Sequence, residues 1–509
     1  MRTKNSLKNI VVAILSQTVN LVLSFVNRAV FLKTLGLEYL GASGLFGDIL
    51  SMLSVAELGI GSAIIFAMYK PMAEEDYDRL HSLVDFYRRA YWLIGGLILT
   101  LGLGLTPFLE LFIKSGYNID HIQIIYVLVL INSAVSYFFS YKITLLTVAQ
   151  KNYIEILVRV SILVCQNIIQ IICLLTTKNY LLYLLIQICF TIMHNIITSR
   201  IATHQFSFLK SKNTIPLDKN EKHALFKNVK ALLLHRLGGF FVLGTDSIII
   251  SKFISLTANG LYGNYTLIIK SINNFTGLIF TAITSSVGNL CASNSCSKML
   301  DIFNKINFLC FWIAAFCSAC LASLMTPFIG LCFGSKNELD ISITLIIILN
   351  FYLTQMRYPV QVFKNALGLF WQDRWKPLVE SIINIIISII LVRFIGLLGV
   401  LLGTAISTIS VVLWVEPRIV YKYGFKVPVI NYFKKYLIYL LLTVVVCYLN
   451  YQACNLIKWG GIVGFAVKVV ISAILPNALL FVLFHKTILF CYYKTLIIEL
   501  FNSFILRKK

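Results

Sequence analysis

Fourteen long apolar stretches, separated by polar loops, constrain the fold of this chain more than any other feature of its sequence. A transmembrane helix needs about 20 mainly apolar residues to cross a hydrocarbon layer of about 30 Å. The stretches reach this length and are too long for the strands of a membrane β-barrel. We therefore predict an all-α polytopic membrane protein with 14 transmembrane helices, near residues 10–32, 43–67, 90–113, 122–148, 154–176, 181–201, 231–251, 260–288, 307–329, 341–370, 378–396, 399–417, 436–456 and 461–485.

Lysine and arginine residues are divided unequally between the two ends of these helices. Of the 44, thirty fall on the side of the N-terminus and seven lie within the stretches. The seven loops on the opposite side carry one each: Lys33, Lys114, Lys178, Lys252, Lys336, Arg393 and Lys458. Because cytoplasmic loops collect Lys and Arg, we predict that both termini are cytoplasmic.

The composition excludes several other classes of protein. With 58% hydrophobic and 13% charged residues, the chain leaves no room for a separate soluble domain. The net charge of +23 is concentrated at the predicted cytoplasmic helix ends, where it meets anionic lipid headgroups, and no nucleic-acid-binding motif accompanies it. No phosphate-binding loop for ATP occurs. Cys317 and Cys320 form a C-x-x-C inside an apolar helix, so we expect neither metal, redox group nor cofactor.

The longest polar segment, residues 202–230, divides the stretches into two groups of six and a terminal pair. Within it, Glu221–Leu234 carries apolar residues at helical spacing, which fits either a helix on the membrane surface or a solvated linker. We predict an N-terminal lobe at 1–203, a basic cytoplasmic linker at 204–230, a C-terminal lobe at 231–420, and two further helices with a basic cytoplasmic tail at 421–509.

The two lobes contain a weak internal repeat. Leu35–Gly44 and Ser255–Gly263 are both turns of small residues that lead directly into the next apolar stretch. Two groups of six helices keep the same direction of insertion, so the sequence predicts a parallel repeat.

Ten charged residues lie within the predicted helices at a depth where insertion carries a cost. At the bilayer centre this cost is about 2.5–3.5 kcal/mol for a charged side chain, so such a residue needs a partner, water or a function. Among the cations, Lys364 and Arg159 lie near a cytoplasmic end, where their long side chains can reach water. We expect Arg28, Arg236, Lys270 and Arg357 to line an aqueous cavity, Arg28 as part of a polar stripe with Asn20, Ser24 and Asn27.

Three acids, Asp48, Glu57 and Asp246, are the deeper candidate partners for these cations, whereas Glu155 lies at the cytoplasmic edge. These predicted helices therefore carry more buried cations than buried acids, which favours an anionic substrate. Guanidinium groups in particular bind phosphate with two parallel hydrogen bonds. The alternative to an aqueous cavity is that these cations form structural ion pairs with the acids, such as Arg28 with Asp246 or Arg357 with Glu57.

Several runs of residues resemble one family of membrane transporters. They are Ala56–Ala63 with Tyr69–Glu74, Thr245–Ser251, Gly288–Leu290, and the region from Gly368–Asp373 through Asn384 and Ser388 to Gly399–Thr404. In these runs, and in the number of helices, the chain resembles the Wzx-type oligosaccharide flippases. The family belongs to a superfamily that includes the MATE multidrug exporters and the lipid II flippases.

The resemblance implies two six-helix lobes around a cavity that opens alternately to either face of a bacterial cytoplasmic membrane. It implies a substrate made of an oligosaccharide repeat unit on polyprenyl diphosphate, flipped outward for capsule, O-antigen or exopolysaccharide synthesis. Arg28, Arg236, Lys270 and Arg357 would contact the headgroup. Glu57 and Asp246 would act in gating or in coupling to a proton or sodium gradient, and the further cavity candidates are Asp48, Arg159 and Lys364.

Two functions of the same fold stay open from the sequence, namely a MATE-type drug exporter and a lipid II flippase. Partners would be membrane lipids and, in the pathway, a polysaccharide polymerase and assembly proteins. An enzyme such as a membrane-bound polymerase, ligase or glycosyltransferase is not expected, because the outward loops of about two to twelve residues are too short to build an active site.

Overall fold

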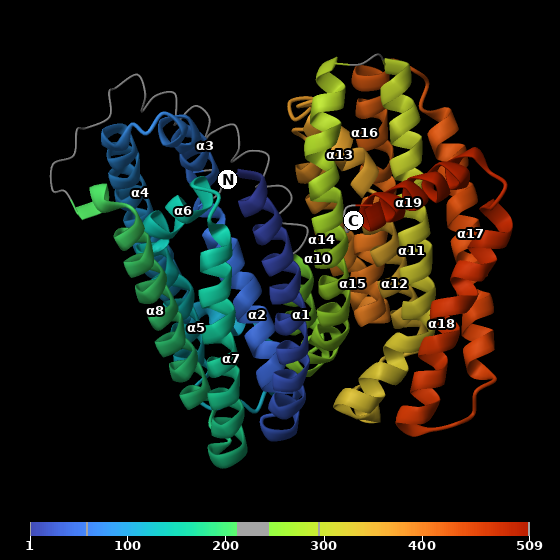
Figure 1. Cartoon of the computed structure of the whole chain (residues 1–509). Helices are drawn as coiled ribbons and strands as arrows, with labels where there is room; N and C mark the ends of the chain where they lie inside the picture. The colour runs from blue at the N-terminus through green and yellow to red at the C-terminus, as the bar shows by residue number, and fades with distance from the viewer. Residues whose placement is uncertain (1, 58–59, 211–243, 294–295, 507–509) are drawn as a thin grey trace. The chain divides into compact units, whose positions relative to one another are not determined.

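The structure of the chain is a computed structural model that describes residues 2–57, 60–210, 244–293 and 296–506 (Figure 1). These residues are almost entirely helical and include no β-strand. The predicted all-α class is confirmed. Most of the predicted basic linker lies outside the described residues, as does Arg236.

Within the described ranges, eleven helices are long and apolar enough to cross a membrane. A twelfth span is formed by Ile122–Phe138 and Ser140–Val148, which meet at a bend of 53°. Of the two remaining predicted spans, the one near 43–67 is broken by a 3₁₀ turn, and the one near 231–251 is described only from residue 244. The chain is therefore a multi-pass membrane protein, and the number of fourteen helices stays a prediction.

The chain forms two compact units, of which unit 1 comprises Met1–Asn264 and Pro377–Gly403. Its helices are α1 (Arg2–Thr34), α2 (Leu37–Leu53), η1 (Ser54–Glu57), α3 (Ile60–Ala73), α4 (Tyr77–Leu105), η2 (Thr106–Phe112), α5 (Ile122–Val135), η3 (Ser136–Phe138), α6 (Ser140–Val148), α7 (Asn152–Thr177), α8 (Tyr180–Gln205), η4 (Ser207–Lys210), the helix at 244–253, the first turns of α10 (Leu256–Ser293), α14 (Lys376–Ile395) and the first turns of α15 (Leu397–Ser407).

Unit 2 comprises Tyr265–Lys376 and Thr404–Lys509. It contains the rest of α10, α11 (Cys296–Phe333), η5 (Ser335–Asn337), α12 (Ile341–Gln355), α13 (Tyr358–Ala366), η6 (Thr408–Val412), α16 (Leu413–Ile419), η7 (Val420–Phe425), α17 (Ile430–Asn455), α18 (Gly461–Phe484) and α19 (Ile488–Leu506). Both η6 and η7 are π-helical turns, so α16 is flanked on each side by a widened helix.

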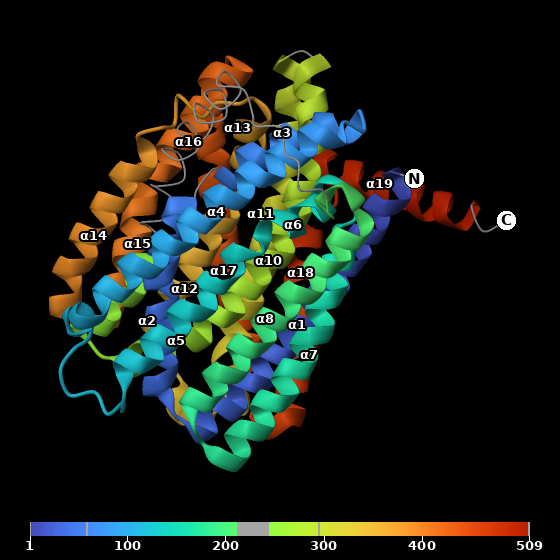
Figure 2. The ribbon, with the colours of Figure 1, turned by 90° about the vertical axis from the view of Figure 1, so that its left-hand side faces the viewer.

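Unit 1 is held together by side-by-side helices with polar contacts between them. Figure 2 shows α7 and α8 running alongside each other, and α1 packs on α7. Asn27 on α1 donates a 2.7 Å hydrogen bond to the side chain of Asn167 on α7, in a buried position. Polar contacts of this kind connect helices within a bilayer, where lipid offers no competing partner. Asn27 therefore faces α7 in this structure, and the predicted polar stripe of the first helix is divided.

The centre of unit 2 is α11, which packs against α12, α17 and α18. Phe303 and Phe311 on α11 are fully buried among aromatic side chains, and Phe311 stacks on Tyr439 with ring centroids 4.0 Å apart. The last helix, α19, lies across α11 (Figure 1), where the hydroxyl of Tyr493 donates to the carbonyl oxygen of Lys305 at 3.0 Å. The sequence had indicated only a basic tail in this region.

Candidate functional site

Arg28 lies on α1 in unit 1, half-buried against the start of α10. Its Nε donates a 2.7 Å hydrogen bond to the side-chain oxygen of Asn264. A Cβ atom at Gly263 would lie 2.6 Å from Nη2 of Arg28, so the glycine is needed for the guanidinium to approach this helix. Because the partner is a neutral amide, Arg28 keeps an uncompensated positive charge in this contact.

Asp48 and Asp246 lie on neighbouring helices of unit 1. The helix at 244–253 packs against α2, since a Cβ atom at Gly244 would lie 3.9 Å from the carbonyl oxygen of Asp48. Asp246 is buried, with 8% of its surface exposed, whereas Asp48 is half-buried. Tyr262 on α10 lies close enough to interact electrostatically with both carboxylates.

On its other side, the helix at 244–253 contacts α14. Thr245 donates to the side-chain oxygen of Asn384 at 3.3 Å, and Asn384 is fully buried. One turn earlier on α14, Glu380 is also buried, with 3% of its surface exposed. This acid was missed by the sequence analysis because it lies near the predicted cytoplasmic end of its apolar stretch, where charges are common.

Glu57 lies in the 3₁₀ turn η1 that interrupts the second predicted span. Its Oε1 accepts a 2.6 Å hydrogen bond from the hydroxyl of Tyr91 on α4. A Cβ atom at Gly61 would overlap the same phenol oxygen, so the absence of a side chain at this position of α3 leaves room for the tyrosine ring. Glu57 thus lies at a break in the helix with a phenol as its partner.

In unit 2, five charged side chains form a cluster at another helix break. Arg357, in the turn between α12 and α13, donates from Nε and Nη2 to the two carboxylate oxygens of Glu416 on α16, each at 3.2 Å. Lys364 contacts Asp373 at 2.5 Å and Glu416 at 3.2 Å. Lys376 contacts Glu416 at 2.5 Å and Asp373 at 3.7 Å.

The cluster has three cations and two carboxylates, which gives it a formal charge of +1. Four of its side chains are at least 95% buried, and Arg357 is the most accessible, with 23% of its side chain exposed. The structure therefore brings two predicted residues, Arg357 and Lys364, to one carboxylate that the sequence had not singled out. Glu416 was missed because the charge lies at the end of a predicted span and 52 residues beyond Lys364.

The other predicted cations have different surroundings. Lys270 is exposed on α10 in unit 2. Arg159 is exposed on α7, where its Nε lies 3.1 Å from Glu155, and His194 lies 3.6 Å from the same carboxylate. In the described ranges, no group of three or more His, Cys, Asp or Glu side chains is placed to hold a metal ion.

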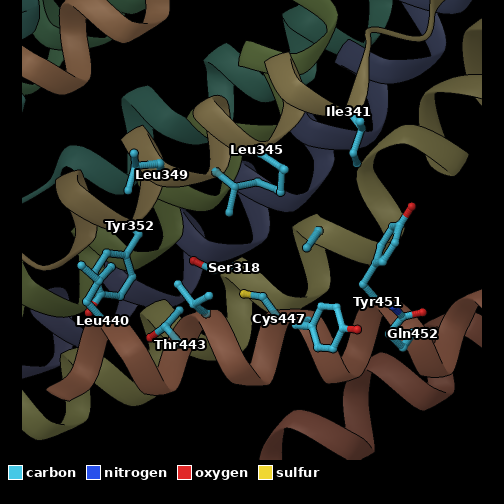
Figure 3. Close-up of a pocket in the computed structure, with 14 residues that line it drawn as sticks. Ser318, Ile341, Leu345, Leu349, Tyr352, Leu440, Thr443, Cys447, Tyr451 and Gln452 are labelled. Carbon is cyan, nitrogen blue, oxygen red and sulfur yellow. The ribbon is translucent and has the colours of Figure 1, made fainter. Parts of the chain in front are cut away.

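Unit 2 also contains an apolar cavity of about 380 Å³ between α11, α12 and α17 (Figure 3). Its lining residues include Leu345, Tyr352 and Val444, and none of them is charged. A cavity with this lining suits hydrocarbon and not a phosphate group.

Comparisons with known proteins show similarity in structure alone. No family model matches the sequence, and no curated protein matches it. The lipid II flippase MurJ, in an inward closed conformation, is 17% identical with a TM-score of 0.64, and the match covers 95% of this chain and 99% of that one.

Two further solved structures are transporters of the MOP superfamily. An inward-facing MATE multidrug resistance transporter is 15% identical with a TM-score of 0.64, and the match covers 79% of this chain and 94% of that one. A MOP transporter from Pyrococcus furiosus, described as having a binding pocket of reverse polarity, is 14% identical with a TM-score of 0.54 over 82% of this chain and 96% of that one. The chain therefore shares its fold with MurJ and with these two transporters.

Proposed function

We propose that the protein is a flippase that moves oligosaccharide repeat units, linked to polyprenyl diphosphate, from the inner to the outer leaflet of a bacterial cytoplasmic membrane. The observations that carry this proposal are two sites of local positive charge within its membrane-spanning helices. Arg28 has an amide as partner, and the cluster around Glu416 has a formal excess of one cation. A diphosphate with its sugars cannot cross hydrocarbon unaided, because its charges and hydroxyl groups would lose their hydration.

In this proposal, the headgroup is bound by four cations of the predicted spans. With Nε of Arg28 bonded to Asn264, the two terminal nitrogens of the guanidinium can donate to phosphate. Lys270 is exposed, and Arg357 is the most accessible cation of its cluster. Arg236, which lies outside the described residues, completes the proposed set. The chain then works without an enzymatic step, by alternating access.

Movement is coupled to a proton or sodium gradient through buried acids. Asp246 is the first candidate, since it is buried beside a helix that carries Asn384 and Glu380. Glu57 is the second, because it lies at a helix break where a change of backbone conformation requires few hydrogen bonds to be broken. In this proposal both termini are cytoplasmic, and the exported units pass to a polymerase and assembly proteins for a capsule, O-antigen or other surface polysaccharide.

A drug exporter and a lipid II flippase of the same fold are the alternative functions. The MATE multidrug transporter covers 79% of this chain and MurJ covers 95%, which supports a lipid-linked substrate over a free drug. The excess of one cation in the cluster around Glu416 also opposes the binding of a cationic drug at that place. Restoration of growth after depletion of the native lipid II flippase would favour the second alternative.

The test is deletion of the gene in its host, followed by complementation. Without the protein, surface polysaccharide should be lost and lipid-linked repeat units should accumulate on the cytoplasmic leaflet. Wild type and Lys458→Ala, a change in an outward loop, should restore export, whereas Arg28→Ala should not, at equal protein abundance. Normal surface polysaccharide in the deletion strain would contradict the proposal, as would drug sensitivity as its only phenotype.

A further inference from the structure

A second cavity of unit 2, of about 350 Å³, lies where α17 begins. Asn304 of α11 and Asn431 and Lys435 of α17 supply its polar lining. Val427 and Pro428, in the loop before α17, supply an apolar wall. Because all of these residues belong to the same unit, the geometry of this cavity does not depend on any movement of one unit against the other.

Lys435 is the charged group of this cavity. Its Nζ donates to the side-chain oxygen of Asn304 at 3.0 Å, and the lysine is exposed. A lysine ammonium has three donors, and a neutral amide accepts only one of them here. Lys435 therefore keeps its full charge and two donors for a further ligand, and the exposed amide of Asn431 lines the same space.

The surroundings of the cavity are strongly basic. Three exposed lysines lie close in sequence to the residues that line the cavity, namely Lys422, Lys426 and Lys434. No aspartate or glutamate occurs between Glu416 and Glu499, and the nearby Asp301 on α11 is paired with Lys305 at 2.8 Å. A ligand that carries an ammonium group as well as a phosphate would find no carboxylate in this stretch, so the charge favours an anionic ligand over a zwitterionic one.

An exposed apolar face of α17 continues from these lysines. Leu437, Ile438, Leu441, Val444 and Tyr448 each have more than half of their surface exposed and follow one another at helical spacing. Lys434 stands one turn before Leu437 on this face. A basic rim followed by an apolar stripe matches a phospholipid, with its phosphate at the membrane interface and its hydrocarbon chains alongside the helix.

We propose that this cavity binds the headgroup of an anionic phospholipid, with the phosphate at Lys435 and Asn431 and a hydrocarbon chain along α17. A free phosphate ion offers the same chemistry to Lys435, but only the phosphate of a lipid is held at the membrane interface, where α17 begins and its exposed apolar stripe follows. The site is separate from the proposed glycan export and does not depend on it.

The test uses the purified full-length protein in detergent, titrated with phosphatidylglycerol and with phosphatidylcholine. Bound lipids are counted by native mass spectrometry. Phosphatidylglycerol should bind in preference to phosphatidylcholine, and Lys435→Gln should weaken phosphatidylglycerol binding about fivefold, the value of one lysine at a membrane surface. Lys458→Gln, in the loop at the other end of α17, is the matched control and should bind like wild type.

Two results would overturn the assignment. One is equal affinity of Lys435→Gln and wild type for phosphatidylglycerol. The other is displacement of phosphatidylglycerol by an excess of inorganic phosphate, which would identify a site for a soluble anion. Should Lys435→Gln fail to fold, Asn431→Leu removes a lining amide from an exposed position, and unchanged lipid binding in that variant would equally contradict the proposal.

Discussion

Gly41 on α2 and Gly260 on α10 stand in a reciprocal contact within unit 1. A Cβ atom at Gly41 would overlap the carbonyl oxygen of Leu256, and a Cβ atom at Gly260 would overlap the carbonyl oxygen of Leu37. Each glycine thus faces the residue four positions before the other one. Asn259 closes the crossing by donating to the carbonyl oxygen of Gly41 at 2.9 Å. The two turns identified as an internal repeat are therefore in direct backbone contact.

This crossing predicts that Gly41→Ala lowers stability. The added methyl group has no space beside Leu256, so the helices must separate, at a cost of about 1–3 kcal/mol for overpacking. Gly47→Ala on the same helix is the matched control, since a Cβ atom there would meet nothing within 4 Å. Thermal unfolding of the purified variants measures the difference. A Gly41→Ala protein as stable as Gly47→Ala would contradict the close contact.

The charge cluster of unit 2 predicts that substitutions of Glu416 and of Arg357 have unequal effects on stability. Glu416→Gln leaves Arg357, Lys364 and Lys376 with Asp373 as the one remaining carboxylate of the cluster, and an uncompensated buried charge costs about 3–5 kcal/mol. Arg357→Gln leaves Glu416 with two lysines, so its effect on the apparent melting temperature should be clearly smaller. Equal losses in both variants would show that the lysines do not share the carboxylate.

A buried amide links α17 and α18 to α11. Nδ2 of Asn450 on α17 lies 3.0 Å from the carbonyl oxygen of Ala319 and 2.8 and 3.0 Å from the hydroxyls of Ser323 and Ser472, and its two hydrogens can serve two of these three acceptors at a time. Asn450→Leu should lower stability by about 1–2 kcal/mol, the range of interhelical hydrogen bonds in membranes. Thr354→Val is the control, because this exposed hydroxyl donates to the carbonyl oxygen of Asn350 within its own helix α12, at 2.8 Å. An unfolding midpoint of the control variant below that of Asn450→Leu would refute this role of the amide.

The fold could be predicted from the sequence because hydrocarbon thickness sets the length of each apolar stretch, and no distant contact is needed to recognise it. The breaks in the helices could not. The stretch at 122–148 is mainly apolar and was predicted as one span, yet the structure bends it by 53° beside Ser140. Such a bend depends on packing against neighbouring helices, which a single sequence does not contain.

The partners of the buried charges could not be predicted from the sequence either. Arg28 and Asn27 are adjacent, so their side chains point about 100° apart around the helix. One of them contacts α10 and the other contacts α7. The depth of a charge in its stretch could be counted, whereas the helix that it faces depends on packing. For the same reason, Arg357 could be predicted as a buried cation but not as a partner of Glu416.

The contact between Arg28 and Gly263 gives the most direct test of the proposed substrate site. Gly263→Ala would place a methyl group 2.6 Å from Nη2 of Arg28, so the guanidinium must turn away while its charge stays in place. If Arg28 binds a phosphate through its terminal nitrogens, this variant should lose about tenfold in export of lipid-linked repeat units, the loss that follows from about 1.4 kcal/mol of binding energy. Arg28→Lys should lose a similar amount, because a lysine cannot form two parallel hydrogen bonds.

The control for this prediction lies on the same helix. A Cβ atom at Gly277 would meet the hydroxyl of Tyr358 at 3.5 Å, an ordinary contact, so Gly277→Ala should export normally. Surface polysaccharide is measured at equal protein abundance in all three strains. Full export by both Gly263→Ala and Arg28→Lys would mean that export depends neither on the orientation of the guanidinium nor on its two parallel hydrogen bonds. Arg28 would then act through its hydrogen bond to Asn264 as a structural residue, and the headgroup site would have to be sought among the cations of unit 2.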